Sequence, residues 1–510
     1  METWYLILLS LTISCILMFF FSKNNPIHNL PPGPPVFPVI GNFLTLPKSP
    51  LELESLLRSL RSKFGPIITL HLGSRPTIFV LDHSLAHEAL VQNGAHFADR
   101  PPPLATHKIA SSNQHDINSA FYGPTWRALR RNLTSTILHS SNVKYFSEAR
   151  KLVFKTLKNK LHCQSNSRHP VGVREHFRYA IFSLLAFMCF GERFDQKQVE
   201  EIDKVVQRSF LGIYTFHKLN LWPRLTRIIL YKSWKEFLQI YKDQDNMLIP
   251  LIIERRKKLK EDGEQGQAED YALSYVDSLL DLQLPEERRK LRDQEIVSLC
   301  NEFLVAGTET TSTSLQWIMA NLVMYPHIQE KLFMEITSVL GDRDQEAEVT
   351  EDDLKRMPFL KAIVFEGLRR HPPGHFLFPR AVTEDVSLGN YVIPKNGKVN
   401  FMLVDMGREP KVWENPLEFK PERFMNNDGD VVFDITGSKE IKMMPFGAGR
   451  RICPGYASAM LQLEYFIANL VWSFEWRPSD RDPVDLSEKQ LITVVMEKPL
   501  QVNIFPRYKI

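Results

Sequence analysis

Cysteine is scarce and scattered in this sequence. Only five cysteines occur in 510 residues, at Cys15, Cys163, Cys189, Cys300 and Cys453. Their odd number and wide separation give neither a disulfide framework nor the paired spacing of a structural zinc site. This usage fits a reducing compartment, and a scaffold built on disulfides is not expected.

An excess of charge of one sign is lacking as well. The 63 Lys and Arg residues nearly balance the 59 Asp and Glu residues, and the resulting net charge of +4 does not suggest nucleic-acid binding. The sequence also has no G-x-G-x-x-G fingerprint for a flavin or dinucleotide. Glycine is rarer than proline, 23 against 33, and the prolines cluster, which predicts stiff connectors. The length allows two or three average domains, or one large enzyme domain with a buried cofactor cavity.

The strongest chemical signal lies in residues 445–455, which read PFGAGRRICPG. Gly447 and Gly449 allow a tight turn that can lie close against a flat ligand. Pro454 suits the first position of the helix predicted by the apolar periodicity that follows. Backbone N–H groups at the start of that helix would point at the sulfur of Cys453 and lower its pKa. These features predict that Cys453 is a metal ligand.

Five fixed positions of this stretch resemble the haem-binding loop of the cytochrome P-450 superfamily, F-x-x-G-x-R-x-C-x-G: Phe446, Gly449, Arg451, Cys453 and Gly455. The resemblance implies haem b (iron protoporphyrin IX) with the Cys453 thiolate as axial ligand, an arrangement that favours O–O cleavage. It also implies that Arg451 neutralises a haem propionate. Two other interpretations of Cys453 remain, a buried structural thiol and a Cys-Pro site that binds haem reversibly for regulation.

Residues 292–324 are predicted to form one long helix with a polar middle. Glycine and several hydroxyl residues lower helix propensity there, so a function should offset the cost. Gly307, Glu309 and Thr310 match the oxygen-binding pattern of the same superfamily, small-Gly-x-acid-Thr. Gly307 would let the helix open beside the iron. The resemblance implies that Thr310 and Glu309 deliver protons during oxygen activation.

Trp126 and Arg130 are four residues apart, so they share one face of a predicted helix. They match the W-x-x-x-R pattern of the superfamily, which implies that both side chains grip a haem propionate. Arg127 and Arg131 share a neighbouring face. They form either part of a basic patch for an acidic electron donor or ordinary solvated surface charge.

Glu366 and Arg369 share one helical face among apolar neighbours, so these charges should be paired. With Arg423 they match the E-x-x-R helix and the P-E-R-F segment of the superfamily, which implies a buried ion-pair network with a folding role. The resemblance makes Arg380 another propionate candidate. Candidate substrate-lining residues favour a largely apolar substrate: Phe303, Ala306, Phe376, Leu377, Leu491 and Ile492.

The uncharged run from Trp4 to Phe21 predicts a membrane anchor. As a helix it would be about 27 Å long, close to the thickness of a thin hydrocarbon core. Glu2 before the run argues against a cleaved signal peptide, and Lys23 after it places the rest of the chain in the cytoplasm. We therefore expect a single-pass anchor at residues 1–24, a proline-rich hinge at 25–36 and a catalytic domain at 37–510. Similarity to microsomal members implies the endoplasmic reticulum membrane.

The expected fold is mainly α with a minor β part, a cytochrome P-450 fold preceded by one N-terminal transmembrane helix. The β part includes a hairpin at residues 67–81 and another at 390–403. The apolar segment 210–223 is either a substrate-channel lid that also dips into the membrane or an ordinary core helix. Residues 254–270 form a charge run that predicts a solvated loop.

The resemblance, which is nearest to membrane-bound plant members, implies a haem-thiolate monooxygenase. The enzyme would insert one atom of O2 into a small, largely apolar organic substrate. Electrons would come from NADPH through a separate cytochrome P-450 reductase. Two alternatives stay open, a haem-thiolate isomerase or dehydratase that needs no reductase, and a non-catalytic haem sensor or carrier. The sequence does not identify the substrate.

Overall fold

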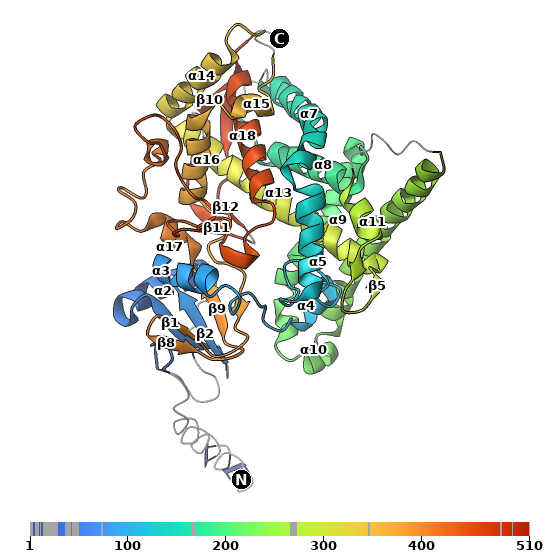
Figure 1. Cartoon of the computed structure of the whole chain (residues 1–510), viewed down its shortest axis with the longest axis vertical. Coiled ribbons are helices and arrows are strands. Elements are labelled where there is room, and N and C mark those ends of the chain that lie inside the picture. The colour runs from blue at the N-terminus through green and yellow to red at the C-terminus, as the bar shows by residue number, and fades with distance from the viewer. Residues whose placement is uncertain are drawn as a thin grey trace. The chain divides into compact units, whose positions relative to one another are not determined.

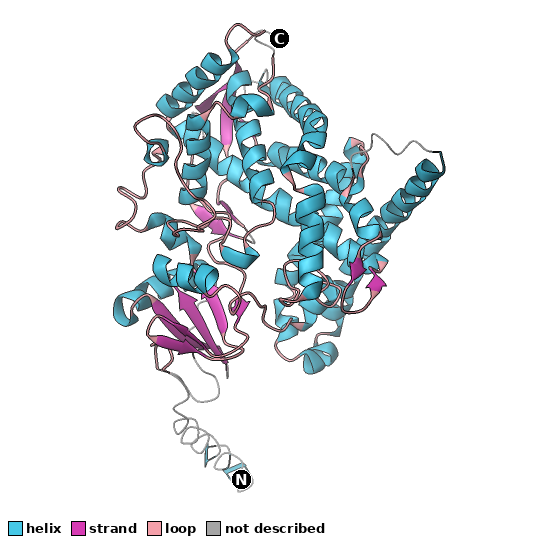
Figure 2. Ribbon diagram, viewed as in Figure 1, coloured by secondary structure: helices cyan, strands magenta, loops and turns pink. Residues whose placement is uncertain are grey.

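The computed structural model describes residues 4, 5, 10, 12, 13, 29–35, 42, 50–72, 75–165, 169–265, 273–344, 347–479, 482–491 and 493–508. The chain divides into two compact units. Unit 1 comprises Met1–Pro101, Gly374–Pro416 and Asp434–Ile452, and unit 2 comprises Pro102–Pro373, Leu417–Phe433 and Cys453–Ile510. Helices dominate, and the strands form small sheets (Figure 2), so the expected mainly α fold with a minor β part is confirmed.

Unit 1 is organised by a four-stranded sheet in the order β1-β2-β9-β6. Its strands are β1 (Ile67–Leu72), β2 (Arg75–Val80), β9 (Lys398–Phe401) and β6 (Arg380–Ala381). Strands β1 and β2 form the predicted hairpin, with Ile67 opposite Val80, and β9 joins β2 in parallel. Alternate side chains enter two separate apolar clusters, so both faces of the sheet are covered. Helix α2 (Pro50–Phe64) contributes Leu57 and Leu60 to one of them.

The second predicted hairpin of unit 1 is placed differently from the expectation. Strand β8 (Tyr391–Ile393) pairs with the preceding β7 (Val386–Leu388), so the hairpin turn is at residues 389–390. The Asn396-Gly397 turn connects β8 to β9 instead, and Asn396 has a φ of 63°. The prediction was wrong because β9 pairs with β2 and β6 in the large sheet. Unit 1 also contains α3 (His83–His87), η2 (Glu88–Gln92), α17 (Leu403–Arg408) and η7 (Gly449–Arg451).

Unit 2 is built around the long helix α13 (Asp293–Met324), most of whose residues are buried. Three helices pack against it (Figure 1): α8 (Arg174–Phe190), α16 (Pro358–Arg370) and α18 (Tyr456–Ser473). These helices carry apolar residues on most sides, as expected for elements inside a large core. The helix predicted at residues 292–324 is thereby confirmed, with Arg292 as its N-cap.

The remaining elements of unit 2 surround this core. The helices are α4 (Ala105–Ala110), α5 (Pro124–Asn132), η3 (Leu133–Ile137), α6 (Ser140–Val143), η4 (Lys144–Phe146), α7 (Ser147–Ser165), α9 (Gln196–Thr215), η5 (His217–Asn220), α10 (Pro223–Ile229), α11 (Tyr231–Gln265), α12 (Tyr275–Leu280), α14 (Pro326–Leu340), α15 (Glu351–Leu354) and η6 (Pro421–Phe424). The strands are β3 (Val171–Gly172), β4 (Gln283–Leu284), β5 (Arg289–Lys290), β10 (Phe474–Pro478), β11 (Glu488–Gln490), β12 (Val494–Met496) and β13 (Gln501–Pro506).

The prediction of a loop at residues 254–270 was largely wrong, because helix α11 occupies most of this range. The helix continues to Gln265, through most of the charge run. Lys258 lies 3.2 Å from Glu254 and Lys257 lies 3.6 Å from Glu261, both at i,i+4 spacing. Such pairs stabilise a solvated helix, so the charges that suggested a loop support the helix instead.

The predicted anchor, Trp4–Phe21, lies largely outside the described residues. Among the residues that the structure does describe, no helix combines the length and the apolar character needed to cross a bilayer. Of the predicted hinge, residues 29–35 are described. The apolar segment 210–223 covers the end of α9, the 3-10 turn η5 and the start of α10.

Candidate active site

The glycines before Cys453 serve a close backbone approach within unit 1. Gly449 has a φ of 69°, and a Cβ there would lie 1.8 Å from the carbonyl oxygen of Leu90 in η2. Gly447 has a φ of 71°, and a Cβ there would lie 3.2 Å from the side chain of Leu377. Only glycine fits position 449, because backbone atoms have no room to move away. The expected tight turn is present. At position 449 glycine is required because the backbone of Leu90 leaves no space for a side chain.

Two predicted propionate-binding arginines lie buried in unit 1. The Nε of Arg451 donates a hydrogen bond to the carbonyl oxygen of Ala98. Arg380 lies in β6, opposite Val399 of β9, and is 3% exposed. Buried cationic side chains need anionic or carbonyl partners. The roles of Arg380 and Arg451 toward haem stay predictions.

Cys453 is a free cysteine and the first residue of the last segment of unit 2, and the residue as a whole is partly exposed. Helix α18 begins only at Tyr456, with Gly455 as its N-cap, so Pro454 precedes the helix instead of opening it. Burial raises the pKa of the Cys453 thiol, although the N–H of Gly455 and the positive charge of Arg130 act in the opposite direction. The expected lowering contribution of a backbone N–H is present, but the net shift of this pKa is upward, because burial of the thiolate outweighs both stabilising contacts.

Trp126, Arg130 and Cys453 come together in unit 2. Trp126 is buried in α5, and its indole Nε1 donates to the carbonyl oxygen of Ile117 over 3.1 Å. The guanidinium of Arg130 lies over the Trp126 ring, 5.7 Å from the ring centre. Burial lowers the pKa of Arg130, and the nearby sulfur of Cys453 opposes this shift. These residues fit a haem site: the sulfur could bind the iron as a thiolate, and the cation could pair with the acidic edge of the haem.

The polar middle of α13 contradicts the expected opening at Gly307. The helix is an uninterrupted α-helix from Asp293 to Met324. A Cβ at Gly307 would lie 2.6 Å from Cδ1 of Leu185 in α8, so glycine allows α8 and α13 to pack closely. The hydroxyl of Thr310 donates to the carbonyl oxygen of Ala306 over 2.6 Å. Threonine hydroxyls inside helices commonly donate to the carbonyl oxygen four residues earlier.

Glu309 forms an ion pair with Arg178, which belongs to α8. Arg178 also binds Asp203 of α9, with 2.5 Å from Nη2 to Oδ1 and 3.1 Å from Nε to Oδ2. The two carboxylates raise the pKa of Arg178 although burial acts to lower it. Burial raises the pKa of Asp203 despite the arginine. Glu309 is therefore held by a partly buried three-membered charge network that joins three helices.

Sequence reasoning missed Arg178 and Asp203. A signal was present at Arg178, since a lone arginine stands between Phe177 and the apolar run of α8. A charged residue on a buried helix face needs a partner of opposite charge, which predicts an ion pair. The identity of the partners depends on helices that are far apart in the sequence.

The predicted scaffold network of Glu366, Arg369 and Arg423 is confirmed in unit 2. The Arg369 Nε lies 2.7 Å from Glu366 Oε2, and Arg423 Nε lies 3.1 Å from Glu366 Oε1. Glu366 and Arg369 are fully shielded from solvent. Both charged residues of the predicted E-x-x-R motif are therefore buried and paired with each other.

The candidate substrate-lining residues fall in both units. In unit 2, Phe303 is buried in α13, Ala306 is exposed, and Leu491 is 46% exposed. In unit 1, Phe376 makes an edge-to-face contact with Phe79 at 6.4 Å, and the N–H of Leu377 donates to the Phe401 carbonyl oxygen. Ile492 lies outside the described residues. Their role in binding substrate stays a prediction.

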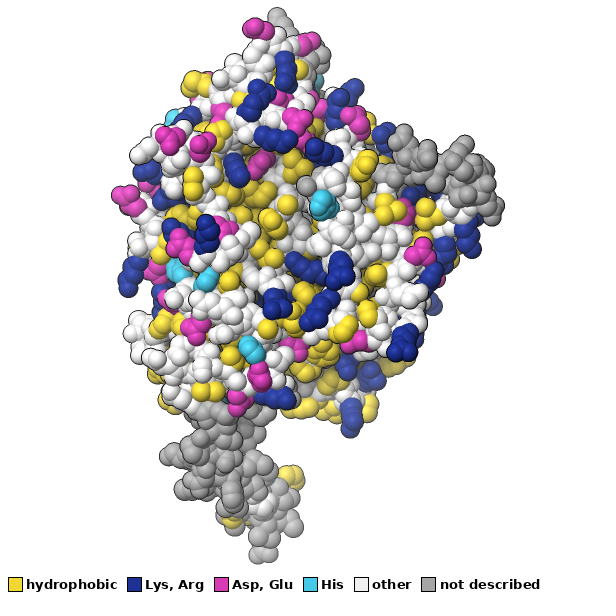
Figure 3. Space-filling view, in the orientation of Figure 1, with side chains coloured by type: hydrophobic (Ala, Val, Ile, Leu, Met, Phe, Trp, Pro, Cys, Tyr) yellow, Lys and Arg dark blue, Asp and Glu magenta, His cyan; other side chains and the backbone are white. Residues whose placement is uncertain are grey.

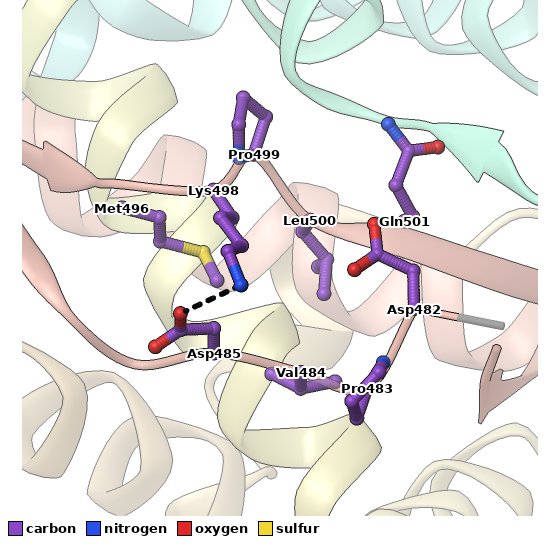
Figure 4. Close-up of a pocket in the computed structure, with 9 residues that line it drawn as sticks. All are labelled: Asp482, Pro483, Val484, Asp485, Met496, Lys498, Pro499, Leu500 and Gln501. Carbon is purple, nitrogen blue, oxygen red and sulfur yellow. Dashed lines mark ion pairs between the residues drawn. The ribbon is translucent and has the colours of Figure 1, made fainter. Parts of the chain in front are cut away.

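A small pocket elsewhere in unit 2 is too small for an organic substrate (Figure 4). Its volume is about 10 Å³, room for about one water molecule. Lys498 reaches toward Asp485 across it, with 3.6 Å between Nζ and Oδ2. Its lining residues are Asp482, Pro483, Val484, Asp485, Met496, Lys498, Pro499, Leu500 and Gln501, and none of them is a candidate site residue.

Comparison with known proteins gives a consistent result. The family model described as "Cytochrome P450" matches residues 31–504. The Arabidopsis thaliana protein "Cytochrome P450 89A9" is 49% identical over 99% of both chains. "Costunolide synthase" of Cichorium intybus is 31% identical over 98% of both chains. The solved structure "Zebra fish cytochrome P450 another structure with Abiraterone" covers 89% of this chain and 100% of its own, with a TM-score of 0.69 and 24% identity, and this likeness supports the fold.

Proposed function

The chain belongs to the cytochrome P450 family and is a monooxygenase with a cysteine-bound haem, and from this we propose that Cys453 supplies the thiolate ligand. The setting of the sulfur supports the proposal, because the Gly455 N–H and the Arg130 cation both lower the pKa of the Cys453 thiol, although burial outweighs them. Haem with a thiolate ligand supplies the chemistry that splits dioxygen and inserts one oxygen atom into an organic substrate. A reduced carbon-monoxide difference spectrum of the purified protein tests the assignment, because a thiolate ligand shifts the Soret band.

We assign the protein's own contribution to charge and proton handling. Arg130 offsets the negative charge of the sulfur, and Trp126 fixes the position of Arg130 through the ring contact. Arg380 and Arg451 would neutralise the acidic edge of the cofactor. Glu309 would supply protons to Thr310, and its ion pair with Arg178 fixes where its carboxylate lies. Thr310 would pass protons onward once its hydroxyl leaves the Ala306 carbonyl.

Thr310→Ala is expected to uncouple NADPH consumption from product formation. The variant should keep its haem, because the Thr310 hydroxyl donates to the carbonyl oxygen of Ala306 in its own helix, α13. Product formed per NADPH consumed should fall about tenfold or more, as expected for loss of a positioned proton donor. The missing reducing equivalents should appear as hydrogen peroxide.

Peroxide, product and NADPH are measured together in one reconstituted assay. Thr310→Ser is the matched control, since it keeps the hydroxyl and should restore most of the coupling. Unchanged coupling in the alanine variant would remove Thr310 from proton delivery.

We propose that the redox partner is a separate NADPH-dependent flavoprotein reductase that docks on a basic surface at α5. Arg127 and Arg131 are exposed at four-residue spacing on this helix. Figure 3 shows Lys and Arg side chains gathered where α5 runs in Figure 1. The same helix carries Arg130 and Trp126 on its buried side, so it connects the surface to the proposed cofactor site. Positive surface charge attracts an acidic partner and raises the association rate.

Reversing this charge with Arg127→Glu plus Arg131→Glu should weaken the interaction with the reductase. The reductase concentration for half-maximal turnover is expected to rise about tenfold at low salt, and the difference should shrink as salt screens the charges. The haem spectrum should not change. Lys197→Glu plus Lys204→Glu on α9 is the matched control, and an equal effect there would show that only net charge matters.

We propose that the chain is attached to the endoplasmic reticulum membrane through Trp4–Phe21, with the catalytic domain in the cytoplasm. An exposed apolar surface around α10 supports an additional contact with the bilayer. Leu221, Trp222, Leu225, Ile228 and Ile229 are between 49% and 78% exposed. Lys and Arg side chains border this end of the molecule in Figure 3, as is typical of segments that lie on anionic lipid. Quenching of Trp222 fluorescence by brominated lipid tests the contact, with Trp222→Phe as the reference.

A further inference from the structure

The loop before α5 is held against α13 at three points in unit 2. Gln294, Ser298 and Glu302 stand at four-residue spacing, so they share one face of α13. The Ser112 hydroxyl donates to the Gln294 carbonyl oxygen over 2.9 Å. The Ser298 hydroxyl donates to the Ala110 carbonyl oxygen over 3.1 Å. This face of α13 therefore fixes the path of the loop.

The third point is the carboxylate of Glu302. One oxygen accepts the N–H of Ile117 over 2.8 Å and the other accepts the N–H of Asn118 over 2.6 Å. Hydrogen bonds to an ionised acceptor are stronger than those between neutral groups. Glu302 thus fixes two consecutive backbone groups with both of its oxygens.

The loop needs such external support because its backbone is strained. Ser112, Asn113 and Gln114 have φ values of 45°, 63° and 66°. Three consecutive non-glycine residues in the left-handed region are unfavourable, and they persist only where the surroundings impose them. Release of the contacts to α13 should therefore let the loop relax to another path.

Ile117 passes this constraint on to α5. Its N–H is held by Glu302, and its carbonyl oxygen accepts the indole N–H of Trp126. The Trp126 ring lies under the guanidinium of Arg130, and Arg130 acts electrostatically on Cys453. A series of contacts therefore leads from α13 to Arg130, whose charge acts on the candidate sulfur ligand.

We infer that Glu302 is a positioning residue for the cofactor site: through Ile117 and Trp126 it fixes Arg130 beside Cys453. The inference rests on the proposed function for the identity of the cofactor. The hydrogen bonds from Glu302 to the loop do not depend on it. Glu302 itself acts through other residues, because its two carboxylate oxygens face the loop backbone.

The chain contains a matched control for this role. Glu335 of α14 likewise accepts two consecutive backbone N–H groups, those of Phe359 and Leu360, over 2.8 and 2.9 Å. Both glutamates therefore hold two consecutive backbone N–H groups with their carboxylate oxygens. Only Glu302 is joined to Trp126 by the contacts described above.

The experiment compares Glu302→Ala, Glu302→Gln and Glu335→Ala in the purified, haem-loaded full-length protein. Three quantities are measured: hydrogen exchange of peptides covering residues 113–121, the rate of haem transfer to excess apomyoglobin, and the thiolate-shifted share of the carbon-monoxide spectrum. Thermal stability is measured for each variant, so that haem loss is compared at equal distance below the unfolding midpoint.

Glu302→Ala should speed exchange in the loop and raise the haem-transfer rate about five- to tenfold, as expected when charge-assisted hydrogen bonds are lost. Its thiolate-shifted share should fall during incubation. Glu302→Gln, which keeps the volume and one acceptor oxygen, should be intermediate. Glu335→Ala should lose stability without either change.

Faster exchange with haem transfer equal to that of the unmutated protein would overturn the positioning role, and unchanged exchange would overturn the contact itself. An equal rise in haem transfer in Glu335→Ala would also overturn it. Failure of the unmutated protein to bind haem would contradict the proposed function instead, while the exchange data would still decide whether Glu302 holds the loop.

Discussion

Cys453→His is expected to abolish monooxygenase activity and to remove the thiolate-shifted Soret band from the reduced carbon-monoxide spectrum. An imidazole can still bind iron, but it does not donate electron density as a thiolate does. The Gly455 N–H and the Arg130 cation both act to stabilise a thiolate at this position, against the effect of burial. We therefore expect loss of turnover even where some haem is retained.

Cys163→His is the matched control, since Cys163 is an exposed cysteine at the end of α7. It should keep the spectrum and the activity of the unmutated protein. A thiolate-shifted band that persists in Cys453→His would place the ligand at another cysteine. The absence of this band from the unmutated, haem-loaded protein would contradict the assignment of Cys453 altogether.

Glu366→Ala is expected to have the largest effect on folding. Its carboxylate binds Arg369 at 2.7 and 2.8 Å, Arg423 at 3.1 Å and the Lys420 N–H at 2.8 Å. Removal of Glu366 leaves a fully buried guanidinium without its main counter-charge. The free energy of unfolding should fall by about 3–5 kcal/mol, as is typical when one member of a buried ion pair is deleted.

Denaturant unfolding of the purified protein measures this loss. Glu366→Gln keeps the shape and one acceptor oxygen but removes the charge, so it should lie between the alanine variant and the unmutated protein. Glu422→Ala is a control, because Glu422 pairs with Lys331 at an exposed position, with both side chains more than 40% exposed. A loss below about 1 kcal/mol for Glu366→Ala would show that the network is not a folding determinant.

Local motifs predicted much of the candidate site. The spacing of Trp126 and Arg130 placed both residues on one face of α5, and the structure brings them near Cys453. The E-x-x-R spacing predicted the pairing of Glu366 with Arg369, because three residues correspond to nearly one helical turn. These predictions succeeded since the interacting groups lie on one helix or in one short motif.

Predictions failed where the answer depends on distant segments. The partners of Glu309 are Arg178 and Asp203, more than 100 residues earlier in the chain, and no local pattern joins them. The pKa of Cys453 was expected to fall because the sequence shows the helix that follows, whereas burial depends on the folded surroundings. The helix at residues 254–265 was missed because a charge run suits both a loop and a helix with i,i+4 pairs.

The close approach of α8 and α13 sets limits for engineering this enzyme toward new substrates. Variation at position 307 requires Leu185 to move, because a Cβ there would lie 2.6 Å from its Cδ1, and Leu185 is only 4% exposed. A design that needs a side chain at position 307 should therefore shorten residue 185 at the same time.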